Sequence, residues 1–249
     1  MSLPAVEHVE KDGFRLRGLE MSRIDAFSDV VFGFALTLLV VSLEVPKTYA
    51  DLALSLRGFV PFAISFSLLM TVWIAHYKIF RRFGTHDRGT ILINAVLLFV
   101  VLFYVYPLKF LFTVASLDFF GATQAAHATG RQFKHLMMFF GFGFAAIYLL
   151  LAALYANGLR ERHVLGLSRL EELLTRGYIA DCAAIGGVGL LSSVVAVLLP
   201  DGYGGDAGWV YLAIAGVRPL MRRLTRRRVE RFHAAVRRAD SQATLAANP

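Results

Sequence analysis

Cysteine is almost absent from this chain of 249 residues, because Cys182 is the only one and it lies in an apolar stretch. A lone cysteine has no partner in its own chain, which excludes a disulfide framework and a cysteine metal site. The seven histidines are scattered without the paired spacing typical of zinc sites. No serine, histidine or aspartate lies in a nucleophile elbow or another catalytic context. We therefore expect no enzyme and no cofactor.

Charge is scarce within long apolar blocks. Hydrophobic residues make up 57% of the chain and its mean hydropathy is +0.58, whereas soluble domains contain about 45–50% apolar residues. A helix needs about 20 apolar residues to cross the hydrocarbon of a bilayer. The sequence therefore predicts an all-α polytopic membrane protein with about six transmembrane helices. The expected spans are residues 23–45, 54–79, 91–114, 136–156, 178–199 and 209–221.

Glycines and short polar segments refine this prediction. Gly141, Gly143 and the run Gly186-Gly187-Val188-Gly189 lie inside expected spans, where small residues allow helices to approach closely. The segment 159–176 alternates charges with leucines at helical spacing. It is too polar to cross the membrane, so we expect a short amphipathic helix on the membrane surface.

The formal net charge of +8 comes from Lys and Arg that lie mainly between the apolar blocks and at the C-terminus. This placement indicates orientation with both termini in the cytoplasm of a cell-membrane protein, not nucleic-acid binding. We expect three regions: a flexible or interfacial arm at 1–22, a transmembrane domain at 23–221 and a solvated basic tail at 222–249. No cleavable signal peptide is expected, because the first apolar block lacks a small-x-small cleavage pattern.

Two carboxylates, Asp25 and Asp29, stand at the start of the first expected helix. A carboxylate beside an uncharged span is costly unless it is paired or hydrated. One interpretation is that both cap a helix whose N-terminus lies at the interface. The other is that they hold neighbouring helices together.

A motif supports the second interpretation. Arg23, Phe27, Ser28 and Asp29 form an R-x-x-x-F-S-D sequence that resembles the hallmark of the transmembrane-protein-175 potassium channels. Further likenesses follow in order: Trp73 and His76, three residues apart in the second expected helix, and Asn94 with Pro107 in the third. The resemblance covers about the first 110 residues well, and the rest only by the number of spans.

The resemblance implies a homotetramer of six-helix subunits, whose first helices line a central pore for potassium as the permeant ion. Its hydrophobic constriction corresponds here to Phe34, Leu38 and Val41, with Thr37 as the polar residue beside them. Phe34 replaces the aliphatic residue usual at the first constriction. Membrane lipids are the other expected partners, and neither nucleic acid nor a small-molecule substrate is expected.

Helical geometry is compatible with this assignment, since Phe34, Leu38 and Val41 fall within about 60° of one another at 100° per residue. Asp29 points largely away from that stripe. We hypothesise that Ser28 and Asp29 join His76 and Asn94 in a buried polar network between the first three helices.

Residue by residue, simpler interpretations stay open. His76 suits an interfacial position, Trp73 an aromatic belt and Asn94 a helix cap, and the apolar stripe suits contact with lipid. For function, the alternative to a passive channel is a proton-coupled secondary transporter that uses Asp29 and His76.

Overall fold

The computed structural model describes residues 8–41, 48–49, 59–119, 130–200 and 203–246. Regular structure in these ranges is helical, apart from one isolated β-bridge between Val9 and Arg15. The elements are α1 (Arg23–Val41), α3 (Phe59–Phe83), α4 (Arg88–Phe119), α5 (Gly130–Arg160), η1 (Glu161–His163), α6 (Arg169–Leu198), η2 (Gly204–Leu212) and α7 (Ala213–Ala246).

Four described helices, α3 to α6, are long and apolar enough to cross a membrane. The all-α membrane prediction is therefore confirmed at this level. The first expected helix begins at Arg23 as predicted, and its expected last residues, 42–45, lie outside the described part of the chain.

The prediction of a separate surface helix at 159–176 is wrong. Helix α5 continues to Arg160, and the chain then turns through η1 before α6 begins at Arg169. The reason is a capping box, in which the Ser168 hydroxyl accepts a bond from the Glu171 N–H and the Glu171 carboxylate accepts one from the Ser168 N–H. This motif satisfies free N–H groups and starts a helix. The charged residues after Ser168 therefore extend a long helix instead of forming a separate one.

The last expected span also differs from the structure. Residues 204–212 form η2, and α7 then runs from Ala213 to Ala246 without a break at Pro219 or at the arginine run. The expected boundary at 222 between a transmembrane domain and a solvated tail therefore falls inside one helix. Arginine is a strong helix former, and Arg226 also bonds Glu230 one turn later at 2.9 Å.

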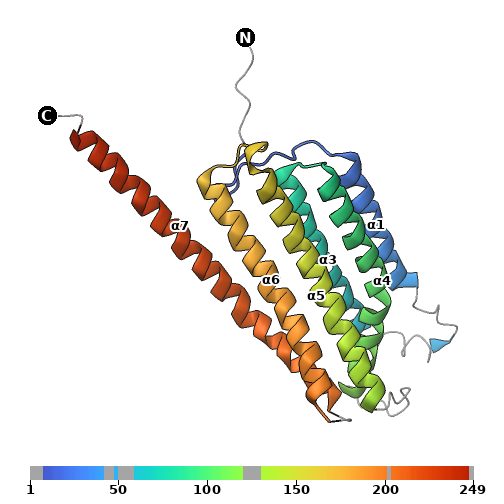
Figure 1. The fold of residues 1–249 in the computed structure, drawn as a ribbon. Coiled ribbons are helices and arrows are strands. Elements are labelled where there is room, and N and C mark those ends of the chain that lie inside the picture. The colour runs from blue at the N-terminus through green and yellow to red at the C-terminus, as the bar shows by residue number, and fades with distance from the viewer. Residues whose placement is uncertain (1–7, 42–47, 50–58, 120–129, 201–202, 247–249) are drawn as a thin grey trace.

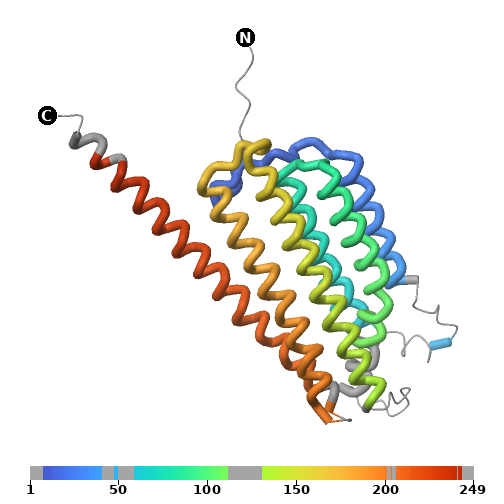
Figure 2. Tube along the Cα trace, viewed as in Figure 1, coloured from blue at the N-terminus to red at the C-terminus, as the bar shows by residue number. Residues whose placement is uncertain are grey.

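The helices form a bundle in which α1 and α7 lie at opposite edges (Figures 1 and 2). Helix α1 packs on α3 and α4, whereas α7 packs on α6 and η2. The closest central approach joins α5 and α6, where a Cβ added at Gly189 would lie 2.8 Å from the Gly141 carbonyl oxygen. The prediction of close packing is thus confirmed at Gly141 and Gly189, while Gly187 faces open space.

The N-terminal arm, expected to be flexible or interfacial, packs against the bundle where the structure describes it. A tight turn at Gly13, whose φ is +87°, points Phe14 into the bundle, where it is fully buried. The Phe14 ring meets Phe83 edge-on at 5.6 Å and lies under the Arg82 guanidinium at 4.8 Å. The buried Phe14 ring, next to the buried Arg82 guanidinium, thus holds the arm in place, although the composition of the arm alone predicts no fold.

Ion pairs fasten the same arm to two helices. Arg82 of α3 bonds Glu10 and also bonds Asp12, at 2.6 Å. Glu171 of α6 accepts bonds of 3.0 Å from the Arg15 N–H and from the Arg17 guanidinium. These contacts therefore fix the arm against α3 and α6 in the segment that precedes α1.

We expect Phe14→Ala to destabilise the protein by about 3–5 kcal/mol, the usual cost of removing a buried phenyl ring. Thermal unfolding of the purified protein, with limited proteolysis of the arm, measures the effect. Lys11→Ala is the control, since Lys11 is exposed on the same turn and its change should stay within about 0.5 kcal/mol. Equal melting temperatures for both variants would contradict an anchoring role.

The carboxylates of Asp12 and Asp87, at this end of the bundle, predict that the stability of the fold decreases in acid. Burial raises the pKa of Asp12, but the Arg82 guanidinium and a bond from the Phe14 N–H outweigh it and hold the pKa below its usual value. Burial likewise raises the pKa of Asp87, yet bonds from Thr90 and Asn157 leave that pKa lowered. A lowered folded-state pKa means that the charged carboxylate stabilises the fold at neutral pH.

That contribution should be complete above the unfolded pKa of about 3.9 and lost as the pH falls through the lowered folded value. We therefore expect the melting temperature to fall below about pH 4. The Asp87→Asn variant should show a smaller fall over the same window in thermal scans from neutral to acidic pH. An identical pH profile for the variant would show that Asp87 does not contribute.

Candidate functional site

Helix α1 has one buried face and one exposed face. The buried residues recur at helical spacing and pack on α3 and α4: Ser28, Phe32, Ala35 and Leu39. The opposite face is exposed and mostly apolar: Phe27, Val30, Gly33, Phe34 and Thr37. Because α1 is at the edge of the bundle (Figure 1), its exposed stripe faces away from the rest of the subunit.

The helix starts at a capping box whose N-cap residue, Ser22, the sequence analysis does not identify. The Ser22 hydroxyl accepts a bond from the Asp25 N–H at 3.2 Å, and the Asp25 carboxylate accepts one from the Ser22 N–H at 3.1 Å. The signal was present as a Ser followed three residues later by an acidic side chain. Asp25 therefore caps α1, as one of the two interpretations expected, whereas Asp29 does not.

A chain of buried hydrogen bonds ties α1 to α3 and α4. Asn94 donates from Nδ2 to the Ser28 hydroxyl at 2.9 Å, and its Oδ1 lies 2.7 Å from His76 Nε2. Ser28 in turn donates to the Ile24 carbonyl at 2.7 Å. All three polar side chains are at most 2% exposed.

The direction of these bonds follows from the groups present. The Asn94 oxygen only accepts, so His76 must donate from Nε2. Each member then has a partner, which satisfies polar groups that would be costly if unpaired at this depth. The imidazole is further enclosed by Phe80 at 4.5 Å and Phe32 at 5.5 Å between ring centroids. Each bond of the network thus has a defined donor and acceptor, and all of its members belong to the same subunit.

Asp29 bonds a different partner from the one hypothesised. Its carboxylate accepts a 2.8 Å bond from Trp73 Nε1, and the Trp73 ring stacks on Tyr77 at 5.7 Å. The structure therefore brings Ser28, His76 and Asn94 together and joins Asp29 to Trp73 as a separate, more exposed pair. Arg23 lies exposed at the first position of α1.

The residues of the expected constriction differ in exposure. Phe34 is 58% exposed and Thr37 lies on the same face, with its hydroxyl donating to the Gly33 carbonyl at 2.8 Å. Leu38 is half-buried against the core, and the side chain of Val41 lies outside the described part. A hydroxyl that donates to its own helix keeps a lone pair free for a cation.

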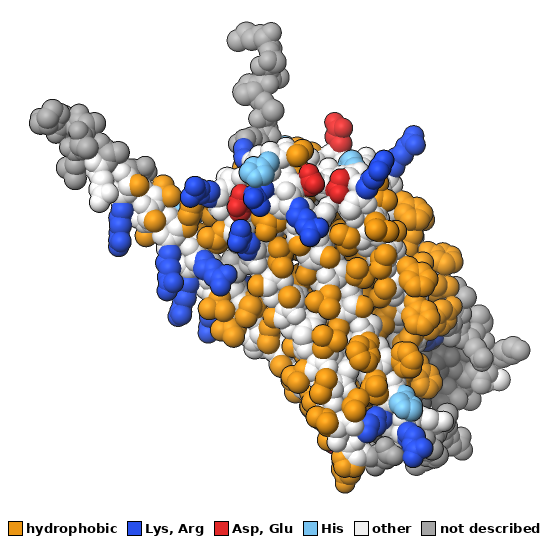
Figure 3. All heavy atoms as spheres, viewed as in Figure 1, with side chains coloured by type: hydrophobic (Ala, Val, Ile, Leu, Met, Phe, Trp, Pro, Cys, Tyr) orange, Lys and Arg blue, Asp and Glu red, His pale blue; other side chains and the backbone are white. Residues whose placement is uncertain are grey.

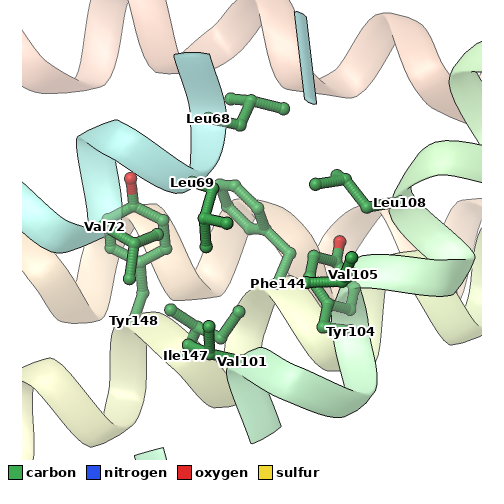
Figure 4. Close-up of a pocket in the computed structure, with 10 residues that line it drawn as sticks. All are labelled: Leu68, Leu69, Val72, Val101, Tyr104, Val105, Leu108, Phe144, Ile147 and Tyr148. Atoms are coloured by element: carbon green, nitrogen blue, oxygen red, sulfur yellow. The ribbon is translucent and has the colours of Figure 1, made fainter. Parts of the chain in front are cut away.

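A cavity between α3, α4 and α5 is lined almost entirely by hydrocarbon (Figure 4). Its two hydroxyls, on Tyr104 and Tyr148, are occupied: Tyr104 donates to the Phe140 carbonyl at 2.8 Å, and Tyr148 accepts from Arg218 at 3.3 Å. Such a space offers a cation nothing in place of its hydration shell. This cavity is therefore a poor ion path within one subunit.

Comparison with known proteins gives a consistent result. Residues 23–104 match the family model described as "Endosomal/lysosomal potassium channel TMEM175". A protein of Marivirga tractuosa named "Potassium channel" is 37% identical over 197 residues, which cover 76% of this chain and 80% of the relative. A potassium channel of Streptomyces collinus is 25% identical over 135 residues, covering 52% and 63% of the two chains.

Solved structures are also similar. A crystal structure of a variant of the potassium channel MtTMEM175 superposes with a TM-score of 0.77 at 32% identity, covering 88% of this chain and all of that one. A TMEM175 homologue from Chamaesiphon minutus, described as potassium-selective, gives a TM-score of 0.54 at 21% identity and covers 80% and 96% of the two chains. At the lower identity the likeness concerns the fold alone.

Proposed function

The chain belongs to the TMEM175 family of potassium channels, and from this premise we propose that it conducts potassium passively through a pore lined by α1 at the centre of a homotetramer. The exposed apolar face of α1 carries this proposal. It lies opposite the buried face of α1, where Ser28 accepts a hydrogen bond from Asn94 of α4. Four copies that meet through α1 would therefore turn Phe34 and Thr37 toward a common axis. Members of this family are channels and not enzymes.

The proposed constriction consists of Phe34, Leu38 and Val41. A narrow apolar ring stops ions by excluding water, because a dehydrated cation finds no replacement ligands there. The Thr37 hydroxyl oxygen, which keeps a free lone pair, would offer a cation one ligand beside that ring. Conduction then requires the ring to widen, which moves α1 relative to its neighbours.

Within each subunit, the proposed role of the polar residues is to hold α1 in place. The bonds among Ser28, His76 and Asn94 join three helices, and the pair of Asp29 with Trp73 adds a second link between α1 and α3. Arg23 and Phe27 complete the motif at the entrance of the helix. These residues would position the pore wall without touching ions.

The proposed topology has six crossings, with α1 and the segment formed by η2 and the start of α7 added to the four apolar helices. Basic residues of the arm, of the α3–α4 turn and of α7 would then share the cytoplasmic side, as orientation by positive charge requires. Both termini would be cytoplasmic, in the cell membrane.

Ion flux from reconstituted liposomes tests the function. A channel gives a potassium current that reverses at the potassium equilibrium potential and does not saturate like a carrier. Native mass spectrometry of the purified protein should give the mass of four chains. Slow, saturable flux that depends on a proton gradient, or a monomer that carries the whole activity, would overturn the proposal.

A further inference from the structure

Helix α7 separates from the bundle partway along its length. It packs closely on α6 where Gly177 meets Thr225, since a Cβ added at Gly177 would lie 2.6 Å from the Thr225 side chain. Beyond that point α7 leans outward, and its far end lies on the same side as the N-terminal arm (Figure 1). The divergence opens a wedge between the first turns of α6 and the middle of α7.

This wedge is an open groove with a strongly basic lining. Its walls are formed by Arg169, Glu172, Leu173 and Arg176 of α6 and by Arg228 and Phe232 of α7. All three arginines are exposed. The one carboxylate, Glu172, already pairs with Arg162 outside the groove at 3.8 Å. The lining therefore carries three guanidinium groups against one carboxylate, and that carboxylate is shared with Arg162.

The groove lies where the polar start of α6 gives way to its membrane-spanning part. Charged residues occupy the first two turns of α6, up to Arg176, and the apolar sequence begins at Tyr178. In the space-filling view, basic side chains follow α7 and gather at the arm end of the bundle, above a surface that is mainly hydrophobic (Figure 3). On the topology proposed above, this is the level of the cytoplasmic headgroups.

We propose that the groove between α6 and α7 binds the headgroup of an anionic phospholipid from the cytoplasmic leaflet, with Arg169, Arg176 and Arg228 around its phosphate. Guanidinium groups suit phosphate oxygens, because their N–H groups form paired bonds in one plane. Leu173 and Phe232 give the groove an apolar part that a free anion does not need and that the glycerol and upper acyl chains of a lipid would cover. The proposal uses the membrane orientation but not conduction itself.

Native mass spectrometry of the full-length protein, taken from mixed micelles of phosphatidylglycerol and phosphatidylcholine, tests the site. The groove variant combines Arg176→Gln with Arg228→Gln. Its matched control combines Arg237→Gln with Arg238→Gln, which removes the same charge from exposed positions of α7 beyond the groove. We expect about a tenfold loss of bound phosphatidylglycerol in the groove variant, since each basic residue near the surface adds to lipid affinity. The control should retain the lipid.

Three results would overturn the proposal. Equal losses in both variants would show a diffuse charge effect, and displacement of the lipid by millimolar inorganic phosphate would show a site for free anions. A change in oligomeric mass in the groove variant would show that the groove is a contact between subunits.

A further variant replaces Arg176 and Arg228 by lysine. Partial binding of the lipid by this variant would support recognition by guanidinium geometry. Because lipid retention is measured without flux, this proposal and the channel function can fail separately.

Discussion

Replacing Phe34 by alanine is expected to raise the potassium current of the reconstituted channel. Phe34 is 58% exposed in the single subunit, so the substitution removes little packing within it. If four phenyl rings narrow the pore, their loss widens and partly wets the constriction. Lowering the barrier by about 1.4 kcal/mol would raise the current about tenfold. Planar-bilayer recording of single channels measures this directly.

Two controls separate pore lining from other roles of α1. Phe99→Ala removes a phenylalanine that is 70% exposed on α4, so it should leave the current unchanged if that side faces lipid. Leu39→Ala truncates a fully buried residue on the opposite face of α1 and should destabilise the subunit by about 2–5 kcal/mol. An intact Phe34→Ala tetramer with an unchanged current would mean that Phe34 does not line the constriction.

The sequence predicts the membrane fold and the polar contacts of α1 better than it predicts the ends of the molecule. Uncharged blocks of helical length have few alternatives in a bilayer, so the central helices follow from composition alone. The family resemblance singles out Ser28, His76 and Asn94, and the cost of unpaired polar groups at membrane depth then predicts that they bond one another. The partner of Asp29 does not follow from the sequence, because the indole N–H of Trp73 can donate to a carboxylate as well as an imidazole N–H can.

The arm and the C-terminal helix depend on information that is not local. Phe14 is a single aromatic residue in a charged segment, and its burial depends on Arg82 and Phe83, which lie about seventy residues away in the chain. Charge density in residues 222–246 favours solvent exposure, but it does not exclude a helix, since arginine is a good helix former. The hydropathy of a segment indicates whether it lies in water or in lipid, but it does not indicate the backbone conformation.

Replacing Asn94 by leucine is expected to damage the assembled channel more than any other single change in the polar network. The substitution keeps a side chain of similar size but leaves the His76 N–H without its acceptor and removes the bond to Ser28. A buried polar group left unpaired costs about 1–3 kcal/mol. Because these bonds hold α1 against α3 and α4, we expect a lower dissociation temperature of the proposed tetramer and loss of current.

Asn157→Leu is the matched control, because Asn157 is also a buried asparagine but bonds Asp87 and Thr90 at the start of α4. It should lower thermal stability while leaving α1, and hence the current per intact channel, unchanged. A second pair probes the donor role of His76: His76→Gln keeps an N–H that can reach Asn94, whereas His76→Leu does not. If all four variants lowered stability equally and conducted equally, the network would stabilise the subunit without positioning the pore helix.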